Sequence, residues 1–413
     1  MNFWLEDYAG MRKLQTRSID GTYTIMIGQT EHSTDTPIFD RPLQIVRPTF
    51  PPIDGMLFDF AQSLTTGQVT NNGPWVIKFE RLLEDYLGVP TLVFSSGQVA
   101  LMSMLRAAGI TGGEVIVPSF TFPATPHATV WAGAEPIFAD IKDDMTFTID
   151  PADVEAKITH KTVAILSVDP YGIASDYDAL ISIGRRRGLR VLSDSAPSFG
   201  TTVGGCRIGG FGDAQIFSFH ATKAFNTMEG GCLCSNDKDL LERARAIRNF
   251  GQSANGNCTI PGLNGKMMEI CGILGIEQLK TFDKAAANRR RCVCRMSNGL
   301  ASIDGLSVGR APADQDPIWL YLPVVINPTT FGCDRDHAAA MLARENLHVR
   351  KYYSPPCHHM SIYSDGRGQP VLPVSERIAR NVLALPVYND MTTAECDGIV
   401  EAFRRVRKGF SLR

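Results

Sequence analysis

The stretch FSFHATKAFNTMEGGCLCSND, residues 217–237, decides how this chain folds. It joins two short apolar segments through a polar turn that holds one lysine, Lys223, and the second segment begins after the glycine pair Gly230–Gly231. A surface lysine normally stands on a charged helix face, whereas Lys223 has no acidic neighbour until Glu229. We interpret Lys223 as a partly desolvated lysine at the end of a buried strand, where its amine can act as a nucleophile.

The composition is that of an ordinary globular protein. Of its 413 residues, 44% are hydrophobic and 20% are charged, and the formal net charge is −2. This balance indicates neither a nucleic-acid nor a membrane partner, and no apolar stretch approaches the ~20 residues that a membrane span needs. The first residues, MNFWLEDYAGMRKL, lack the basic and apolar regions of a signal peptide. We therefore expect a cytoplasmic protein.

All ten cysteines lie at or after Cys206, and four of them form the pairs Cys232/Cys234 and Cys292/Cys294. Metal sites and disulfide frameworks favour C-x-x-C pairs or short secreted chains, and this sequence offers neither. On a strand, Cys232 and Cys234 face the same side, as buried small apolar residues do. We expect no metal site and a reducing compartment.

Strand and helix patterns alternate along most of the chain. TLVFSSG, EVIVPS, EPIFADI, TVAILSVDPYG and LRVLSDSA predict buried strands, and helical patterns such as QVALMSMLRAAG and DYDALISIGRRRG separate them. The alternation predicts βαβ units in an α/β fold with a mostly parallel sheet, whose ligands bind beyond the carboxyl ends of the strands. We expect an N-terminal arm over residues 1–45, a large domain over 46–284 and a smaller α+β domain over 285–413.

Three predicted strands end in groups of unusual chemistry. The first runs into Ser95, Ser96 and Gly97 at a strand-to-helix turn, which favours a phosphate although such turns also serve as plain N-caps. The second ends at Asp194, which could also be a turn aspartate, and the third leads to Lys223. A phosphate cradle, a buried carboxylate and a reactive lysine are together what pyridoxal phosphate requires.

Seven segments in order resemble the DegT/StrS-type sugar aminotransferases, which are pyridoxal phosphate enzymes of fold type I. The segments are TNNGPWVIKFE, FSSGQVAL, PSFTFPATPHA, DSAPSFG, GDAQIFSFHATKAFNTMEGG, RNFGQ and LNGKMMEICGILGIEQL. The resemblance is strongest over residues 95–252 and extends in weaker form over 45–410. It implies a mostly parallel seven-stranded sheet in the large domain, transaminase activity (EC 2.6.1 class) and pyridoxal 5'-phosphate as the cofactor.

Carried over residue by residue, the resemblance implies that Lys223 is the Schiff-base lysine and the acid/base that moves a proton during the reaction. Asp194 would pair with the pyridine nitrogen, and Phe122 would stack on the cofactor ring. Asn264 would reach the phosphate in the neighbouring subunit, which implies a homodimer with shared active sites. The residues that would bind the phosphate within one subunit are Gly97, Gln98 and Ser218.

Three positions depart from the pattern of the family that the sequence resembles. Gln98 stands where Ser or Thr is usual, Pro197 where His or Gln is common, and Asp169 where His is frequent. The change to Pro197 removes a possible donor near the phenolic oxygen of the cofactor. None of the three changes removes the core chemistry, but they bear on the fine structure of the site and on the substrate class.

The segment YYSPPCHHMSIY resembles a family segment at the mouth of the active site. Two of its residues are candidates for substrate contact, Tyr353 and His359, although packing is an equally good interpretation of His359. His220, in FSFHATK, is better explained as a structural residue than as a catalytic one.

The resemblance also indicates the substrates. It implies L-glutamate as amino donor, and the TNNGP and Tyr352–Tyr353 segments are most similar to the branch that aminates nucleotide-linked 4-keto-6-deoxyhexoses for antibiotics or surface glycans. A keto-cyclitol of the aminoglycoside type is the alternative acceptor. Related sugar dehydratases replace the lysine with histidine, so Lys223 argues against that class. Lys223 and Asp194 also argue against a regulatory protein that keeps the fold without catalysis.

Overall fold

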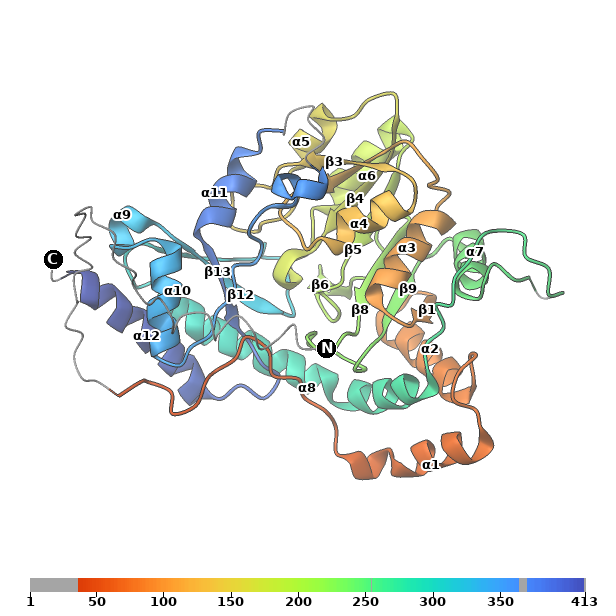
Figure 1. Cartoon of the computed structure of the whole chain (residues 1–413), viewed down its shortest axis with the longest axis horizontal. Coiled ribbons are helices and arrows are strands. Elements are labelled where there is room, and N and C mark those ends of the chain that lie inside the picture. Colours follow the sequence, from red (N-terminus) through yellow and green to blue (C-terminus); the bar gives the residue numbers. More distant parts are fainter. Residues whose placement is uncertain (1–35, 254, 364–369, 412–413) are drawn as a thin grey trace, which may run out of the picture. The chain divides into compact units, whose positions relative to one another are not determined.

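A seven-stranded sheet organises the part of the chain that the computed structural model describes, namely residues 36–253, 255–363 and 370–411 (Figure 1). In spatial order its strands are β1 (Thr91–Phe94), β9 (Gly231–Cys234), β8 (Ala214–Ser218), β5 (Arg190–Asp194), β4 (Thr162–Val168), β2 (Glu114–Pro118) and β3 (Glu135–Ala139). Within this sheet β9 runs antiparallel to both of its neighbours and the other six strands run in one direction. The predicted mostly parallel seven-stranded sheet is confirmed. Most of the predicted N-terminal arm, residues 1–35, lies outside the described residues.

Helices cover both faces of the sheet because alternate strand residues point to opposite sides. Leu92 and Phe94 of β1 belong to the core formed with α3, α4 and α7, whereas Val93 belongs to the core formed with α2 and α8. The α-helices described between residues 36 and 300 are α1 (Leu57–Thr66), α2 (Pro74–Leu87), α3 (Gly97–Ala107), α4 (Ala124–Trp131), α5 (Pro151–Ala156), α6 (Tyr177–Arg187), α7 (Lys238–Arg248) and α8 (Glu269–Leu300).

A second, antiparallel sheet follows in the C-terminal part of the chain. It consists of β10 (Leu306–Val308), β12 (Tyr321–Ile326) and β13 (Val382–Pro386), and its core includes residues of α10 (Arg335–Arg344) and α12 (Thr393–Ser411). Helix α8 runs through the predicted domain boundary at residue 285 and supplies Leu274 to one core and Met296 to the other. The domain limits therefore stay a prediction. The remaining elements are the short sheet β11 (Gln315–Asp316), β6 (Thr202–Val203) and β7 (Cys206–Arg207), and the helices α9 (Pro328–Phe331) and α11 (Pro373–Asn381).

The paired cysteines of the sheet are buried, as expected. Cys232 and Cys234 lie on the same face of β9 with their Sγ atoms 3.9 Å apart. Of the other pair, Cys292 is buried and Cys294 is exposed on α8. Among the described helices, we find none with the length and apolar character that crossing a bilayer demands.

A buried carboxylate joins α2 to α8. The N-terminus of α2 has no side-chain cap of its own, so its free N–H groups need acceptors from elsewhere. Glu269, in the first turn of α8, accepts the N–H groups of Gly73 (2.7 Å), Trp75 (2.9 Å) and Val76 (3.1 Å) and is fully buried. The interaction fixes α2, and with it β1, against the helix that leads into the C-terminal sheet.

We predict that Glu269→Ala lowers the free energy of unfolding by about 3 kcal/mol, because three buried N–H groups lose their acceptor. Glu269→Gln should cost less, since its amide oxygen still accepts. Urea titration followed by circular dichroism measures both. Glu242→Ala is the matched control: this carboxylate is 71% exposed beside Arg245, and its loss should cost less than about 1 kcal/mol. Equal effects of Glu269→Ala and Glu242→Ala would contradict the capping role.

Candidate active site

The carboxyl ends of β1, β2, β4, β5 and β8 lie along one edge of the sheet, because these strands run in the same direction. We call this the carboxyl edge. Each of these strands ends at or leads directly into a residue that the sequence singles out: Gly97, Phe122, Asp169, Asp194 and Lys223. The topology thus gathers residues that are more than a hundred positions apart in the sequence.

Lys223 lies in the turn between β8 and β9, where its N–H donates to the carbonyl of His220 at 2.8 Å. The side chain is partly buried. Burial lowers the pKa of the Lys223 amine below its usual value, and the negative charge of Asp194 opposes that shift. An amine with a lowered pKa has a larger neutral fraction, which is the form that attacks a carbonyl carbon.

A second buried cation lines the same narrow cavity as Lys223. Arg289 of α8 donates to the carbonyls of Trp319 and Leu320 at 2.7 and 2.9 Å and to Oδ1 of Asn389 at 3.0 Å. Burial lowers the pKa of Arg289 to about 10, which leaves it protonated at neutral pH. Sequence reasoning missed this residue because its carbonyl partners lie in an irregular segment that no motif marks.

Asp194 ends β5 and is only 5% exposed. Burial raises the pKa of its carboxyl group, while donated hydrogen bonds and the charge of Lys223 act in the opposite direction. The donors are the Thr125 hydroxyl at 2.7 Å and the Ala196 N–H at 3.2 Å. A carboxylate held in this way favours a cationic partner. The sequence analysis missed Thr125, although a hydroxyl in the helix that follows β2, another strand ending at the carboxyl edge, was a usable signal.

Asp169, which replaces a frequent histidine of the family pattern, is fully buried in a network of its own. Its carboxylate accepts the Ser175 N–H (2.9 Å), the Tyr177 hydroxyl (2.5 Å) and the Ser195 hydroxyl (2.6 Å). Burial is the main cause of the raised pKa of Asp169. The Asp169 N–H also donates to the carbonyl of Asp194 at 3.3 Å. This aspartate therefore links the ends of β4 and β5 and supports the backbone of Asp194.

The predicted phosphate-binding residues come together at the N-terminus of α3. A Cβ atom on Gly97 would lie 2.7 Å from the Cβ of Ser218, so only glycine lets the helix approach the end of β8 this closely. Ser96 caps the helix by accepting the Val99 N–H at 3.2 Å, and the first N–H groups of a helix have no partner within it. The side-chain amide of Gln98 donates to the carbonyl of Ala124 at 3.3 Å. Gln98, which stands where Ser or Thr is usual in the pattern that the sequence resembles, therefore joins α3 to α4.

Two aromatic side chains lie at the carboxyl edge. Phe122 is 56% exposed after β2. Tyr353 packs on Phe120 and Tyr171, with ring centroids 5.4 and 5.9 Å away. Burial raises the pKa of the Tyr353 hydroxyl, and the charges of neighbouring groups, Asp194 among them, add to the shift. Pro197 is buried in the turn after β5.

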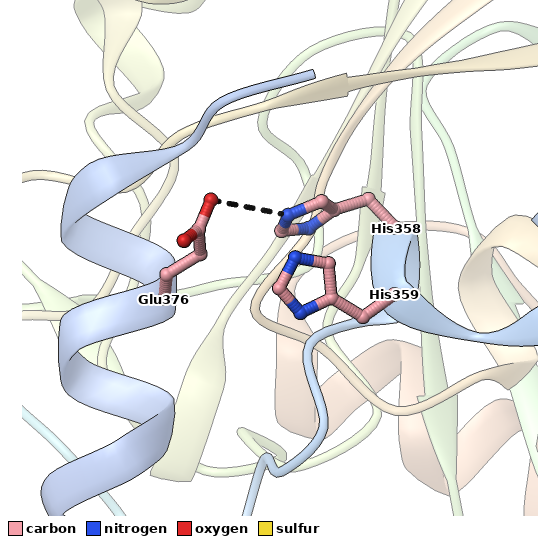
Figure 2. Close-up of side chains that lie close together, drawn as sticks. All are labelled: His358, His359 and Glu376. Carbon is pink, nitrogen blue, oxygen red and sulfur yellow. Dashed lines mark ion pairs between the residues drawn. The ribbon is translucent and has the colours of Figure 1, made fainter. Parts of the chain in front are cut away.

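Three other predicted residues lie around this arrangement. The described contacts place His359 against His358 and near Glu376 (Figure 2). The ring of His220 contacts the Thr222 hydroxyl at 2.7 Å and lies 3.5 Å from Glu229. These contacts fit the structural role expected for His220, because they brace the turn that carries Lys223. Asn264 is exposed.

The segment of Asn264 reaches the carboxyl edge through the backbone. The carbonyl of Gly265 accepts the N–H of Ser95, directly after β1, at 2.8 Å. An isolated bridge pairs Asn264 with Asn249. The exposed amide of Asn264 therefore lies next to the end of the strand that leads into α3.

These groups fit pyridoxal phosphate. The cofactor carries an aldehyde, a ring nitrogen and a phosphate, which require an amine, a carboxylate and a cluster of N–H and O–H donors. The carboxyl edge offers one of each in Lys223, Asp194 and the N-terminus of α3 with Ser218. Because Gly97 has no side chain, α3 can approach β8 closely, and the residue at position 97 does not cover the donor cluster.

Proteins of similar sequence and structure include sugar transaminases. The dTDP-4-amino-4,6-dideoxy-D-glucose transaminase of Shigella dysenteriae is 31% identical over 369 residues, which cover 89% of this chain and all of that protein. The crystal structure of DesI with its TDP-sugar product superimposes with a TM-score of 0.85 at 34% identity, covering 91% of this chain and 96% of DesI.

A third similar structure bears on the cofactor. It is the PLP form of the sugar aminotransferase Spr1654 from Streptococcus pneumoniae, which gives a TM-score of 0.82 at 25% identity over 89% of this chain and 99% of that one. Pyridoxal phosphate is accordingly the cofactor, and transamination is the reaction. The model of the DegT/DnrJ/EryC1/StrS aminotransferase family matches residues 56–404. The chain belongs to this family of aminotransferases.

Proposed function

We propose that this enzyme transfers the amino group of L-glutamate to the keto group of a nucleotide-linked sugar, a dTDP-4-keto-6-deoxyhexose, in amino-sugar biosynthesis. The convergence of Lys223 and Asp194 from two neighbouring strands at one partly buried edge carries the proposal. The names of the Shigella transaminase and of the DesI complex, both linked to TDP-sugars, support the choice of acceptor.

Lys223 has two tasks in this proposal. Its amine attaches the cofactor, and once the amino donor has displaced it, the same amine moves a proton at the carbon that carries the amino group. The lowered pKa suits both tasks, because the neutral amine is the nucleophile and also the base. When bound, pyridoxal phosphate supplies the electron sink that makes this carbon acidic.

Asp194 and the donors around it orient the cofactor. The carboxylate of Asp194 keeps a proton on the ring nitrogen, and Thr125 and Ala196 keep the carboxylate ionised by donating to it. Phe122 presents an exposed ring that stacks on the cofactor. The N–H groups of Gly97 and Gln98 and the hydroxyl of Ser218 bind the phosphate.

The site is completed by a second copy of the chain in our proposal. The exposed Asn264 lies beside the end of β1 through the contact of Gly265 with Ser95, and we assign its amide to the cofactor phosphate of the partner subunit. The enzyme is thus a homodimer with shared active sites. Tyr353 is the proposed substrate contact, since its ring packs on Phe120, two residues before Phe122, and the corresponding role of His359 stays a prediction.

A keto-cyclitol acceptor is the runner-up, because its enzymes share the same motifs. A regulatory protein without catalysis would have no need of a buried carboxylate and a desolvated lysine, both of which cost stability. The presence of both groups at the carboxyl edge favours an enzyme.

The test of the proposed function is the visible absorbance of the bound cofactor. We expect L-glutamate to bleach the visible absorbance band of the bound cofactor. A dTDP-4-keto-6-deoxyhexose should restore this band, because the two half reactions follow a ping-pong scheme. GDP- and UDP-linked ketosugars and a keto-cyclitol are the comparison acceptors. Restoration by the cyclitol alone would replace our acceptor with the runner-up.

Lys223→Ala should lack the covalent attachment and lose at least about a thousandfold in kcat, since one residue serves as both nucleophile and base. Lys280→Ala is the matched control, because this lysine is 62% exposed on α8. If Lys223→Ala kept its activity while Lys280→Ala behaved like the unmodified enzyme, the convergence of Lys223 and Asp194 would no longer support the proposed function.

Thr125→Val should weaken cofactor binding about tenfold, because Asp194 loses its shortest hydrogen bond and its pKa rises further. The cofactor requires the carboxylate form, so affinity holds above the pKa of Asp194 and is lost as the pH falls through it. The acid limb of the affinity profile should therefore move to higher pH in the variant. Equilibrium dialysis at several pH values measures it.

Thr129→Val is the control for that series, because the buried Thr129 hydroxyl donates only to the carbonyl of Thr125 among the described contacts (3.3 Å). Thr125→Ser should keep most of the affinity. An acid limb at the same pH in Thr125→Val and in Thr129→Val would show that Thr125 does not tune Asp194.

Shared active sites predict complementation. Lys223→Ala lacks the amine, and Asn264→Asp places a negative charge beside the partner's phosphate, so each homodimer should be impaired. In a mixed dimer one site carries both changes and the other carries neither. After subunit exchange of an equal mixture, about a quarter of the sites should work. Asn257→Asp, in the same exposed loop, replaces Asn264→Asp in the control mixture, and no gain over its separate components is expected there.

A further inference from the structure

Two adjacent histidines and a glutamate form a cluster outside the residues assigned to the cofactor. His358 and His359 lie in a short 3-10 turn, and Glu376 lies in the first turn of α11. Figure 2 shows both imidazole rings turned toward the glutamate. One ligand atom from each of the three residues lies within 4.8 Å of the other two, and the two ring centroids are 4.0 Å apart.

The cluster contains a polar atom without a hydrogen bond. The His358 side chain is fully buried, and its Nδ1 contacts the Ser119 hydroxyl at 2.5 Å. Its Nε2 has no hydrogen-bond partner within the described part of the chain and lies 3.6 Å from Oε1 of Glu376. A buried ring nitrogen normally has a partner, so an occupant between His358 and Glu376 would account for this geometry.

The separation is that of two ligands of one metal ion. Nitrogen and oxygen ligands about 2.0 Å from a tetrahedral zinc ion lie roughly 3.3 Å from each other. The 3.6 Å gap between His358 and Glu376 needs only a small adjustment to reach this value. A direct hydrogen bond would instead have closed the gap to about 3 Å.

The surroundings favour a divalent cation with an open side. The Ser119 hydroxyl contacts Nδ1 of His358, so Nε2 is the ring nitrogen that faces Glu376, and the Leu372 N–H donates to Oε1 of Glu376 at 3.1 Å. Asp140 accepts the N–H groups of Val374 and Ser375 at the start of α11, while Arg380 lies 3.8 Å from Oε2 of Glu376. His359 is exposed and leaves a path for the ion.

We propose that His358 through Nε2, His359 through one ring nitrogen and Glu376 through its carboxylate bind a zinc ion or a similar divalent transition metal, with water in the remaining position. The Ser119 hydroxyl at Nδ1 of His358 then acts as the outer partner that orients metal-binding histidines. The sequence did not predict this site, because its ligands are two neighbouring histidines and a glutamate seventeen positions further on.

The metal would fasten the turn of His358 to α11 next to the active site. Cys357 donates its N–H to the carbonyl of Ser119 at 2.9 Å, and Ser119 begins the segment that leads to Phe122 and Thr125. Bound metal should therefore stiffen this wall of the site. We expect an effect on stability and no direct part in the chemistry.

The test uses the cofactor-loaded enzyme, made without a polyhistidine tag and dialysed against a chelator. Calorimetric titration with zinc chloride should show one high-affinity ion per chain, and saturating zinc should raise the Tm by about 3 °C. Cobalt chloride should give visible bands without sulfur-to-metal absorbance, because the exposed cysteines Cys206, Cys258 and Cys294 take no part.

His359→Ala and Glu376→Gln should each weaken zinc binding at least about tenfold and abolish the rise in Tm. His337→Ala is the matched control, because His337 also lies beside a carboxylate, 2.9 Å from Asp334, but has no third ligand among the residues that the structure describes. Both target residues lie at the open side of the cluster, so the variants should fold, and the cofactor spectrum checks this.

Three results would overturn the proposal. One is the absence of zinc binding in the unmodified enzyme, and another is equal affinity in His359→Ala, Glu376→Gln and His337→Ala. The third is unchanged zinc affinity in His359→Ala together with a raised KM for the ketosugar in the chelated enzyme, which would make His359 a substrate contact. The first two results do not depend on whether the proposed acceptor sugar is right, since metal affinity and Tm are measured without substrate, and only the KM in the third uses the ketosugar.

Discussion

A carboxylate buried at the end of a central strand is the constraint on which the rest of the site depends. Asp194 is almost inaccessible to solvent, and burial alone would favour its protonated form. Three groups from different strand ends oppose this tendency: the Thr125 hydroxyl, the Ala196 N–H and the charge of Lys223. The site thus stores a negative charge that a protonated pyridine ring can neutralise, which connects the order of the strands to the choice of cofactor.

The parallel sheet makes this arrangement possible. Helical crossovers return each strand in the same direction, so polar groups at the strand ends meet at one edge while the strand interiors stay apolar. Strand β9 is antiparallel and starts at the carboxyl edge with Gly231. The turn that joins β8 to β9 and carries Lys223 therefore lies at this edge. The same edge receives α3, whose approach to Ser218 tolerates only glycine at position 97.

Much of this could be predicted from the sequence, and the reasons for the exceptions are physical. Alternating strand and helix patterns, together with Lys223 and Asp194, predicted the sheet and its reactive edge, because periodicity and strand ends are local properties. Thr125 and Glu269 escaped because their partners are backbone or carboxylate groups 69 and 193 to 196 positions away. The two neighbouring histidines illustrate the same limit: only the path of a short turn decides that His358 is buried and His359 exposed.

Buried charge also connects cofactor binding with stability. The raised pKa of Asp194 means that its ionised form costs stability above that pKa, and the lowered pKa of Lys223 means that its protonated form costs stability below that pKa. Wherever both groups are charged, each costs the cofactor-free protein stability, and their mutual attraction reduces that cost. In the proposed function a bound cofactor would take up the amine of Lys223 and pair a cationic ring with Asp194, which would relieve both costs at once. Relief of these two costs would therefore add to the stabilisation by pyridoxal phosphate, and it follows from the same burial that lowers the pKa of Lys223.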